Sequence, residues 1–281
     1  MAALQNSLGR VGVYSSLWLL MASGSSCATN TRDAAKNEVS HVAGDSHAGS
    51  PSGNGASASG SGGASSQGNT NVGGASAPSV GAYTTDFNLN ESPLSEGGKW
   101  KHDGLDWTTI STSDGLAFGT QKGNGGFDDS YAYLAGTFPA NQSGSAVIHL
   151  ESGIASSSYQ EVEILLRWTD SAHNSIGYEC NLAFSGQYAE IIKWPGPRGK
   201  EKSEFKFISS GNPVAGGVHD GDTFQCDVVG SVITSRLNGK VIATGSDSSI
   251  PGGGAPGIGF YAEGAPASRK FSFSKFTGTG L

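Results

Sequence analysis

Apolar and polar residues alternate in short runs along the C-terminal two thirds of the chain. Within Thr223–Val229, the apolar Phe224, Cys226 and Val228 alternate with polar neighbours, the period of a strand with one buried face. Two further β-branched runs follow, joined by Asn238-Gly239, the pair that a type I′ hairpin turn favours because both central positions need positive φ. Three such strands cannot bury a face alone, so they are predicted to belong to a larger sheet.

Similar runs with turn signals about every 8–12 residues are typical of an all-β domain. They are Trp107–Ser111, Leu116–Thr120, Tyr131–Phe138, Ser145–Glu151, Gln160–Trp168, Ile176–Phe184, Tyr188–Trp194, Glu204–Ile208, Gly257–Ala262 and Lys270–Phe276. No window of helical length carries a 3.6-residue period. We therefore predict a two-sheet antiparallel β-sandwich, a jelly roll, over residues 82–281.

The alternation also predicts which side chains face the core. The inward set is Val162, Ile164, Leu166, Trp168, Tyr178, Cys180, Leu182 and Phe184, and the outward set is Glu161, Glu163, Arg167, Glu179 and Asn181. In Val232–Leu237 the parity of Ile233 is taken as inward, although the other parity is nearly as apolar. A register error of one residue would invert a whole strand.

The N-terminus has the pattern of an export signal. Residues 1–27 contain Arg10, the short apolar core Val11–Ala22 and a run of small residues that ends in Cys27. Two processing routes remain open. Either Gly24–Cys27 resembles a bacterial lipobox and Cys27 is lipidated, although Gly24 departs from the usual apolar residue, or signal peptidase cleaves near Cys27. A buried N-terminal helix is the third alternative. We expect an exported protein, either secreted or anchored in the cell envelope.

Residues 28–81 are predicted to be a disordered tether rich in glycine and serine. Such a composition cannot bury enough apolar area to offset the loss of backbone entropy. About 50 residues of flexible coil span roughly 40 Å, enough to hold a domain clear of a membrane. The alternative is low-complexity sequence without a function.

Composition excludes several partners. A formal net charge of −7 argues against nucleic acid and against docking on anionic lipid. No run of about 20 apolar residues exists, so a lipid anchor is the one membrane attachment expected. The scattered histidines and the absence of C-x-x-C argue against zinc, and no cofactor is expected apart from calcium.

Three cysteines occur, and Cys27 lies in the signal segment. Cys180 and Cys226 both fall on inward positions of predicted strands. In an oxidising compartment they can form a disulfide if their strands are neighbours. The alternative is two buried free thiols that pack as small hydrophobic groups.

A series of weak turn and strand motifs resembles the concanavalin A-like lectin/glucanase superfamily, in particular laminin-G-like jelly rolls. In order, these motifs are Asp86-Phe87, Pro93-Leu94 and Trp100; Tyr178-Glu179 and Ile192-Lys193-Trp194; Gly221-Asp222, Val229-Gly230 and Leu237-Asn238-Gly239-Lys240; Pro256–Tyr261; and Phe273 to Phe276. The resemblance implies the jelly-roll fold and a glycan or polysaccharide partner. It does not decide between binding and cleavage, because family members include glycan binders, glycosidases and polysaccharide lyases.

A binding face without catalysis is the preferred interpretation. Its candidate residues are Glu163, Arg167, Glu179, Asn181 and Trp194, with Trp168 as a second stacking candidate or a core residue. Glu161 and Glu163 match part of the Glu-x-Asp-x-x-Glu strand of family-sixteen glucanases, so a divergent glycosidase or lyase is the alternative, and a protein-adhesion module is the third. Asp86, Asp128 and Asp129, expected in loops, are candidate calcium ligands.

Overall fold

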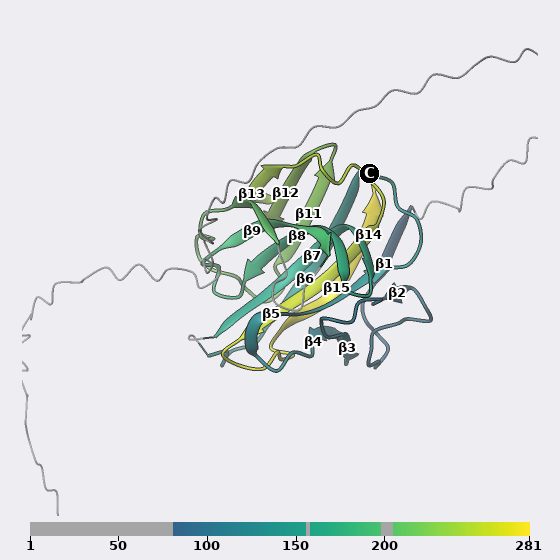
Figure 1. The fold of residues 1–281 in the computed structure, drawn as a ribbon. Coiled ribbons are helices and arrows are strands. Elements are labelled where there is room, and N and C mark those ends of the chain that lie inside the picture. Colours follow the sequence, from purple (N-terminus) through teal and green to yellow (C-terminus); the bar gives the residue numbers. More distant parts are fainter. Residues whose placement is uncertain (1–80, 156–157, 198–204) are drawn as a thin grey trace, which may run out of the picture. The chain divides into compact units, whose positions relative to one another are not determined.

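The computed structural model describes residues 81–155, 158–197 and 205–281, and only the backbone of residues 125–128. These residues form two antiparallel sheets and include no helix, which confirms the predicted sandwich (Figure 1). Within this part of the chain, no helix is long and apolar enough to cross a membrane. The predicted signal segment, Cys27 and residues 28–80 of the predicted tether lie outside the described residues.

The first sheet has eight strands. Its order is β13 (Lys240–Ser246), β12 (Val232–Leu237), β11 (Thr223–Val229), β6 (Gln142–Leu150), β15 (Phe271–Gly280), β4 (Leu116–Gly119) and β3 (Ile110–Ser113), and β1 (Ala82–Thr85) also pairs with β15. Strands far apart in the chain thus become neighbours, as β11 and β6 do.

The second sheet has seven strands and packs against the first. Its order is β10 (Lys206–Ser210), β9 (Ala189–Pro197), β8 (Asn174–Ala183), β7 (Tyr159–Ser171), β14 (Ala255–Glu263), β5 (Asn124–Leu134) and β2 (Trp100–Lys101). Every pairing between these strands is antiparallel.

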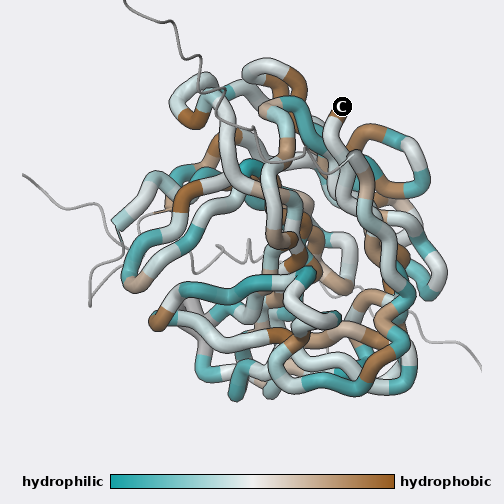
Figure 2. Tube along the Cα trace, turned by 90° about the vertical axis from the view of Figure 1, so that its right-hand side faces the viewer, coloured by the Kyte–Doolittle hydropathy of each residue, from teal (hydrophilic) through white to brown (hydrophobic). Residues whose placement is uncertain are grey.

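The core lies between the two sheets. Short apolar stretches separated by polar ones follow the strands in Figure 2, as the alternation predicts. Fully buried members include Ile148, Val162, Ile164, Leu182, Phe224, Phe273 and Phe276. The predicted parity of β12 is confirmed, because Ile233 and Ser235 are both 0% exposed. The turn between β12 and β13 has φ of 51° at Asn238 and 77° at Gly239, as a type I′ turn requires.

A bulge in β7 corrects one part of the face assignment. The register with β8 shifts between Leu166 and Thr169, and Arg167 has a φ of 50°. An extra residue reverses the alternation beyond it. Arg167, predicted outward, therefore turns toward the interior, and Trp168, predicted inward, turns to the outer face of the sheet.

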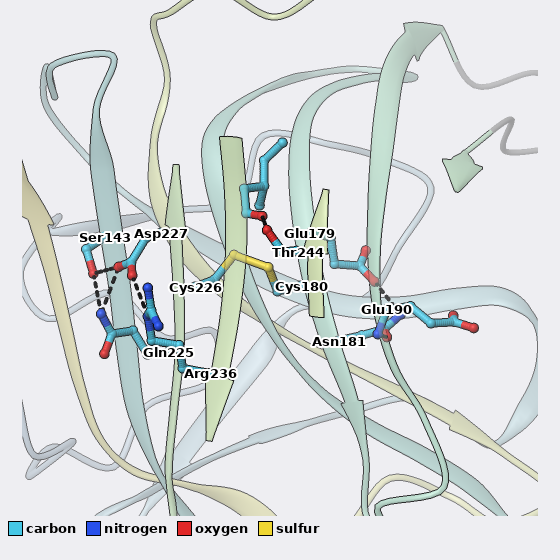
Figure 3. Close-up of a disulfide and its surroundings, with 11 residues drawn as sticks. Ser143, Glu179, Cys180, Asn181, Glu190, Gln225, Cys226, Asp227, Arg236 and Thr244 are labelled. Atoms are coloured by element: carbon cyan, nitrogen blue, oxygen red, sulfur yellow. Dashed lines mark hydrogen bonds and ion pairs between the residues drawn. A yellow bond between two sulfur atoms is a disulfide. The ribbon is translucent and has the colours of Figure 1, made fainter. Parts of the chain in front are cut away.

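A disulfide joins the two sheets through the core. Cys180 on β8 and Cys226 on β11 have Cα atoms 6.1 Å apart and a bonded S–S distance of 2.01 Å (Figure 3). Both residues are 0% exposed. The alternative of two free thiols does not describe this structure.

Candidate functional site: the outer face of the seven-stranded sheet

Polar and aromatic side chains gather on the face of the seven-stranded sheet that points away from the core. Figure 3 shows Glu179, Asn181 and Glu190 on the side of the sheet opposite the disulfide. Cross-strand partners share a face, so the register defines three rows on this outer face. The rows are Tyr131–Gly259–Glu163–Asn181–Glu190, Asp129–Tyr261–Glu161, and Tyr133–Gly257–Leu165–Glu179–Ile192.

Three carboxylates from neighbouring strands meet on this face. Glu161, Glu163 and Glu179, the glutamate cluster, each offer a carboxylate oxygen within 4.8 Å of the others. All three are buried, at 2%, 1% and 2% exposure. Like charges this close repel one another. The cluster therefore raises the energy of the fold unless neighbouring groups or a ligand compensate.

Neighbouring donors form hydrogen bonds with Glu161 and Glu179. The Tyr188 hydroxyl donates to Oε1 of Glu161 at 2.6 Å. Glu179 accepts from Nε1 of Trp194 at 2.8 Å and from Nδ2 of Asn181 at 3.3 Å. Two donors fix the orientation of the Glu179 carboxylate, since each oxygen has its own partner.

An aromatic cluster adjoins the glutamate cluster. It consists of Trp107, Tyr131, Trp168 and Trp194, with ring centroids of Trp107 and Trp194 4.6 Å apart and those of Trp107 and Tyr131 5.3 Å apart. The indole of Trp194 belongs to both clusters through its bond to Glu179. Carboxylates and indole rings thus lie side by side on one face of the sheet.

Two tyrosines of β5 donate hydrogen bonds to aspartates, one in β7 and one in the loop after β2. The Tyr131 hydroxyl donates to Asp170, and the Tyr133 hydroxyl donates to Oδ2 of Asp103 at 2.6 Å. Burial, and then the hydrogen bond to Asp103, raises the pKa of Tyr133 well above its usual value. The Tyr133 phenol therefore stays a neutral donor over the physiological range.

The structure brings four of the five predicted binding residues together and corrects their exposure. Glu163, Glu179, Asn181 and Trp194 share the outer face, but their exposures are only 1%, 2%, 0% and 2%. The expectation that they are open to solvent is wrong. Alternation along a strand identifies a face but not the side chains that cover it, and here Tyr188 and Trp107 lie over neighbouring positions.

Arg167 is placed elsewhere by the bulge. Its guanidinium donates from Nε to the carbonyl of Ala140 and from Nη2 to that of Gly230, both at 2.7 Å, and from Nη1 to the carbonyl of Ile250. The side chain is 1% exposed. Its three donor nitrogens are engaged with backbone, so the expectation that Arg167 shares the outer face with the other predicted binding residues is wrong.

Several residues of this face escaped the sequence analysis. Glu190 has the parity of Trp194 on β9, so the alternation contained the signal for it. Tyr188 lies just before β9, and the fold brings its hydroxyl to the glutamate cluster. Trp107 lies in a loop, and the fold brings its ring into the aromatic cluster. Alternation along a strand predicts neither contact.

Two of the three candidate calcium ligands, Asp128 and Asp129, lie in a strand and not in a loop as expected. Asp86 forms an exposed ion pair with Lys275 at 3.3 Å. Asp129 lies in β5 rather than in a loop and is 3% exposed, and the side chain of Asp128 lies outside the described residues. Among the described residues, the one group of three or more side chains that can share a metal ion is the glutamate cluster. Its oxygen ligands are of the type that calcium prefers.

No protein-family model matches the sequence, and no curated protein matches it. Solved structures with a similar fold include the carbohydrate-binding module CBM66 from Bacillus subtilis, at 14% identity over 62% of this chain and 98% of that chain, with a TM-score of 0.42. A protein of unknown function with a galectin-like fold from Bacillus subtilis shares 11% identity over 73% of this chain and 98% of that chain, with a TM-score of 0.44. The Bacillus licheniformis β-glucanase shares 11% identity over 73% of this chain and 100% of that chain, with a TM-score of 0.41. At these identities and TM-scores, the likenesses assign no family, ligand or chemistry to this chain.

Proposed function

We propose that the protein is an exported carbohydrate-binding module that holds a glycan at the outer face of the seven-stranded sheet and does not cleave it. The observation that carries this proposal is the junction of the glutamate cluster with the aromatic cluster, made by the bond from Trp194 to Glu179. A pyranose ring presents hydroxyl groups around its edge and C–H groups on its faces. Carboxylates accept from the hydroxyls, while aromatic rings pack on the apolar face. Because the side chains of both clusters are at most 8% exposed, the proposal requires groups that lie over them, such as Tyr188, to move aside when a glycan binds.

The energetics of the cluster support a ligand site rather than a structural role. Glu161, Glu163 and Glu179 are buried within 4.8 Å of one another, so their charged forms repel and need compensation from neighbouring donors or from a ligand. Clusters of buried like charges are energetically unfavourable for folding, and such clusters tend to lie at functional sites. Half-buried aromatic residues, Tyr188 and Phe205, lie at the margin of the same face, and the Phe205 ring is 5.5 Å from that of Trp194.

Hydrolysis is the second candidate, and one observation favours it. Carboxylate oxygens of Glu161 and Glu163 lie within 4.8 Å of one another. Retaining glycosidases use two carboxyl groups about 5–5.5 Å apart, one as nucleophile and one as general acid. In this alternative Glu161 and Glu163 are the catalytic pair of a divergent glycosidase or lyase. A protein-adhesion module is a third possibility that differs in its partner.

The decisive experiment combines binding with turnover. The mature chain is applied to a glycan array with and without a chelator, and reducing-end release is measured on the polysaccharides that bind. We expect binding without release. Glu163→Gln should weaken the binding, while Asp227→Asn, on the outer face of the other sheet, is the matched control. Release of reducing ends that Glu163→Gln abolishes would establish hydrolysis instead. An array on which no glycan binds would contradict the proposal and favour the protein-adhesion module.

The part of this experiment with a chelator tests whether calcium assists glycan binding. The glutamate cluster is the candidate site for it. Loss of glycan signal with chelator, restored by calcium, is the expected result for an assisting ion. An unchanged array would exclude calcium from binding.

Export and anchoring are proposed from the signal-like N-terminus. A disulfide between Cys180 and Cys226 suits an oxidising compartment, which supports export. Lipidation at Cys27 would tether the domain to a membrane. Palmitate labelling that is lost in Cys27→Ser supports the anchor, and equal labelling of both chains would exclude lipid at that residue.

A further inference from the structure

Two hollows that share His219 are lined by no residue of the glutamate cluster or the aromatic cluster. The first has a volume of about 370 Å³ and lies between the β10–β11 loop and the β12–β13 hairpin. The second has a volume of about 380 Å³ and lies between the same loop and residues that follow β6. His219 lines both. We call the two hollows together the end groove.

The loop that carries His219 is firmly attached to the sandwich. Backbone bonds run from Gly211 to the carbonyl of Ala189 at 2.7 Å and from Val214 to that of Gly186 at 2.8 Å. Near its end, Gly221 donates to the carbonyl of Ile148 at 2.9 Å. These bonds fix the shared wall of the end groove, so a ligand finds it already formed.

The opposite wall of the first hollow is fixed by the hairpin turn. Asn238 donates from Nδ2 to Oδ1 of Asp222 at 2.7 Å and accepts at its own Oδ1 from the backbone of Thr223 at 2.8 Å. The second oxygen of Asp222 accepts from the backbone N–H of His219 at 2.7 Å. Asp222 therefore ties the two walls together.

The lining of each hollow combines apolar and polar groups. In the first, Val214, Val241 and Ile242 provide apolar surface, and Lys240 and Asn212 provide polar groups. In the second, Ile154 and the half-buried ring of Phe184 are apolar, and Glu151 and Asp220 are polar. Val241 is 47% exposed, a large apolar side chain that the described fold leaves open.

We propose that the end groove is a second glycan site, in which a short stretch of chain places one sugar residue in each hollow and His219 contacts the link between them. Each volume lies near the lower end of the range of about 300–1,000 Å³ for ligand pockets, as suits a single sugar unit. The mixed lining matches the apolar faces and polar edges of a pyranose. The imidazole of His219 can donate and accept, so it suits a bridge of ether and hydroxyl oxygens.

The choice of glycan as ligand class rests on the proposed function, whereas the position of the site does not. Two separate sites on one domain would raise the avidity for a polysaccharide, because the second contact is made at a high local concentration. A single glycan need not span both sites, since neighbouring chains of a polysaccharide can occupy one each.

The test uses the mature chain with four soluble probes: the hexasaccharides of β-1,3-glucan, β-1,4-glucan, β-1,4-xylan and chitin. The imidazole resonances of His219 are followed by NMR, and affinities are measured by calorimetry. We expect at least one probe to move the His219 resonances in both the wild type and Glu163→Gln. His219→Ala and Lys240→Ala should weaken the affinity for that probe by about tenfold. Lys122→Ala changes an exposed lysine outside both hollows and should leave the affinity unchanged.

The outcomes separate the two sites. A probe that binds and is weakened by Glu163→Gln, while the His219 resonances stay still, refutes the end groove and leaves the proposed function intact. Movement of the His219 resonances together with an unaltered overall affinity in Glu163→Gln supports the end groove and refutes the outer face. Absence of any binding by the four probes refutes the end groove as a site for these glycans.

Discussion

Oε2 of Glu163 fills the space that a side chain at Gly259 would need. The two residues are cross-strand partners on β7 and β14, and a Cβ atom added to Gly259 would lie 2.2 Å from this oxygen. A separation below 3.0 Å forces something to move. The position of Glu163 in the glutamate cluster therefore depends on the absence of a side chain on the neighbouring strand.

Gly259→Ala should displace the Glu163 carboxylate and weaken glycan binding at the outer face. Overpacking of this kind destabilises a fold by about 1–3 kcal/mol. We expect a lower free energy of unfolding in urea and a lower affinity for the best glycan of the array. Gly81→Ala is the control, because a Cβ atom there meets nothing within 4 Å. If Gly259→Ala had the stability and the glycan affinity of the wild type, the position of Glu163 would not depend on the missing side chain at Gly259.

The sequence was sufficient wherever the determinants are local. The β12–β13 hairpin follows from Asn238-Gly239, whose positive φ values are a property of two residues. The faces of β7 up to Leu166 and of β8 follow from alternation alone, and so do the inward positions of Cys180 and Cys226. The packing of the two sheets, which places β8 opposite β11 and makes the disulfide possible, needed the fold.

The bulge at Arg167 shows where local reasoning ends. Its conformation is matched by partners from three other segments, the carbonyls of Ala140, Gly230 and Ile250. Gly254 also lies against it, because a Cβ atom on Gly254 would come within 2.3 Å of the Arg167 carbonyl carbon. None of these contacts is visible in the alternation of β7. The same limit applies to the glutamate cluster, which forms because the register of β7 and β8 brings Glu179 beside Glu163.

Arg167→Lys should destabilise the fold without a specific effect on glycan binding. Lysine replaces a planar fork with a single ammonium group, so it cannot reach three carbonyls that lie in different directions. A buried carbonyl that loses its donor costs about 1–3 kcal/mol. We expect a loss of about 2–4 kcal/mol in urea unfolding, with the affinity of the folded fraction unchanged. Lys101→Arg is the control, because it exchanges lysine and arginine at an exposed position and should leave the free energy of unfolding unchanged.

Selective loss of glycan affinity in Arg167→Lys, at wild-type stability, would restore the original sequence-based prediction. It would mean that the guanidinium reaches a ligand despite its bonds to the backbone.

The disulfide between Cys180 and Cys226 should contribute most of its effect through the unfolded chain. The two residues are 46 positions apart, and closing a loop of this size stabilises a fold by about 4 kcal/mol in the chain-entropy description. Cys180→Ala with Cys226→Ala should therefore lower the free energy of unfolding by roughly 2–4 kcal/mol. We expect the sandwich to persist, because the surrounding core residues remain.

The comparison is urea unfolding of the wild type and the double variant, with and without a reducing agent. Reduction should lower the stability of the wild type and leave the double variant unchanged. A wild type that is insensitive to complete reduction, with both thiols titrated, would contradict a stabilising role for the bond.

An ion pair at the side of the sandwich should make stability sensitive to acid. Lys193 lies 2.6 Å from Oδ2 of Asp247, and the Tyr178 hydroxyl donates to Oδ1 at 2.9 Å. Burial acts to raise the pKa of Asp247, but the bonds from Lys193, Ser249 and Tyr178 together outweigh it and hold the pKa well below its usual range. Because the pKa is lower in the folded state, the stabilisation is complete above the ordinary value of about 3.9. It is lost as the pH falls further below that value.

Tyr178 should act in the opposite direction at high pH. Burial, and then its hydrogen bond to Asp247, raises the pKa of Tyr178 to about 12. A pKa that is higher in the folded state stabilises the fold below the ordinary value of about 10, and the contribution disappears as the pH rises through about 12. In the wild type, the free energy of unfolding in urea should therefore fall between pH 9 and pH 12. Tyr178→Phe should make this fall smaller.

Asp247→Asn tests the acidic limb. Removing the charge at neutral pH deprives Lys193 of its partner, and charge-assisted hydrogen bonds contribute about 1.5–3 kcal/mol. We expect a loss of that size at pH 7, and we expect the difference between variant and wild type to shrink as the pH is lowered from 4 toward 2. Asp114→Asn is the matched control, because Asp114 pairs with Arg269 at 2.8 Å on the exposed surface, where solvent screens the interaction. Its effect at pH 7 should be much smaller. An equal loss in the two variants, or a loss in Asp247→Asn that stays constant down to pH 2, would mean that the Lys193–Asp247 pair does not set the acid sensitivity of the sandwich.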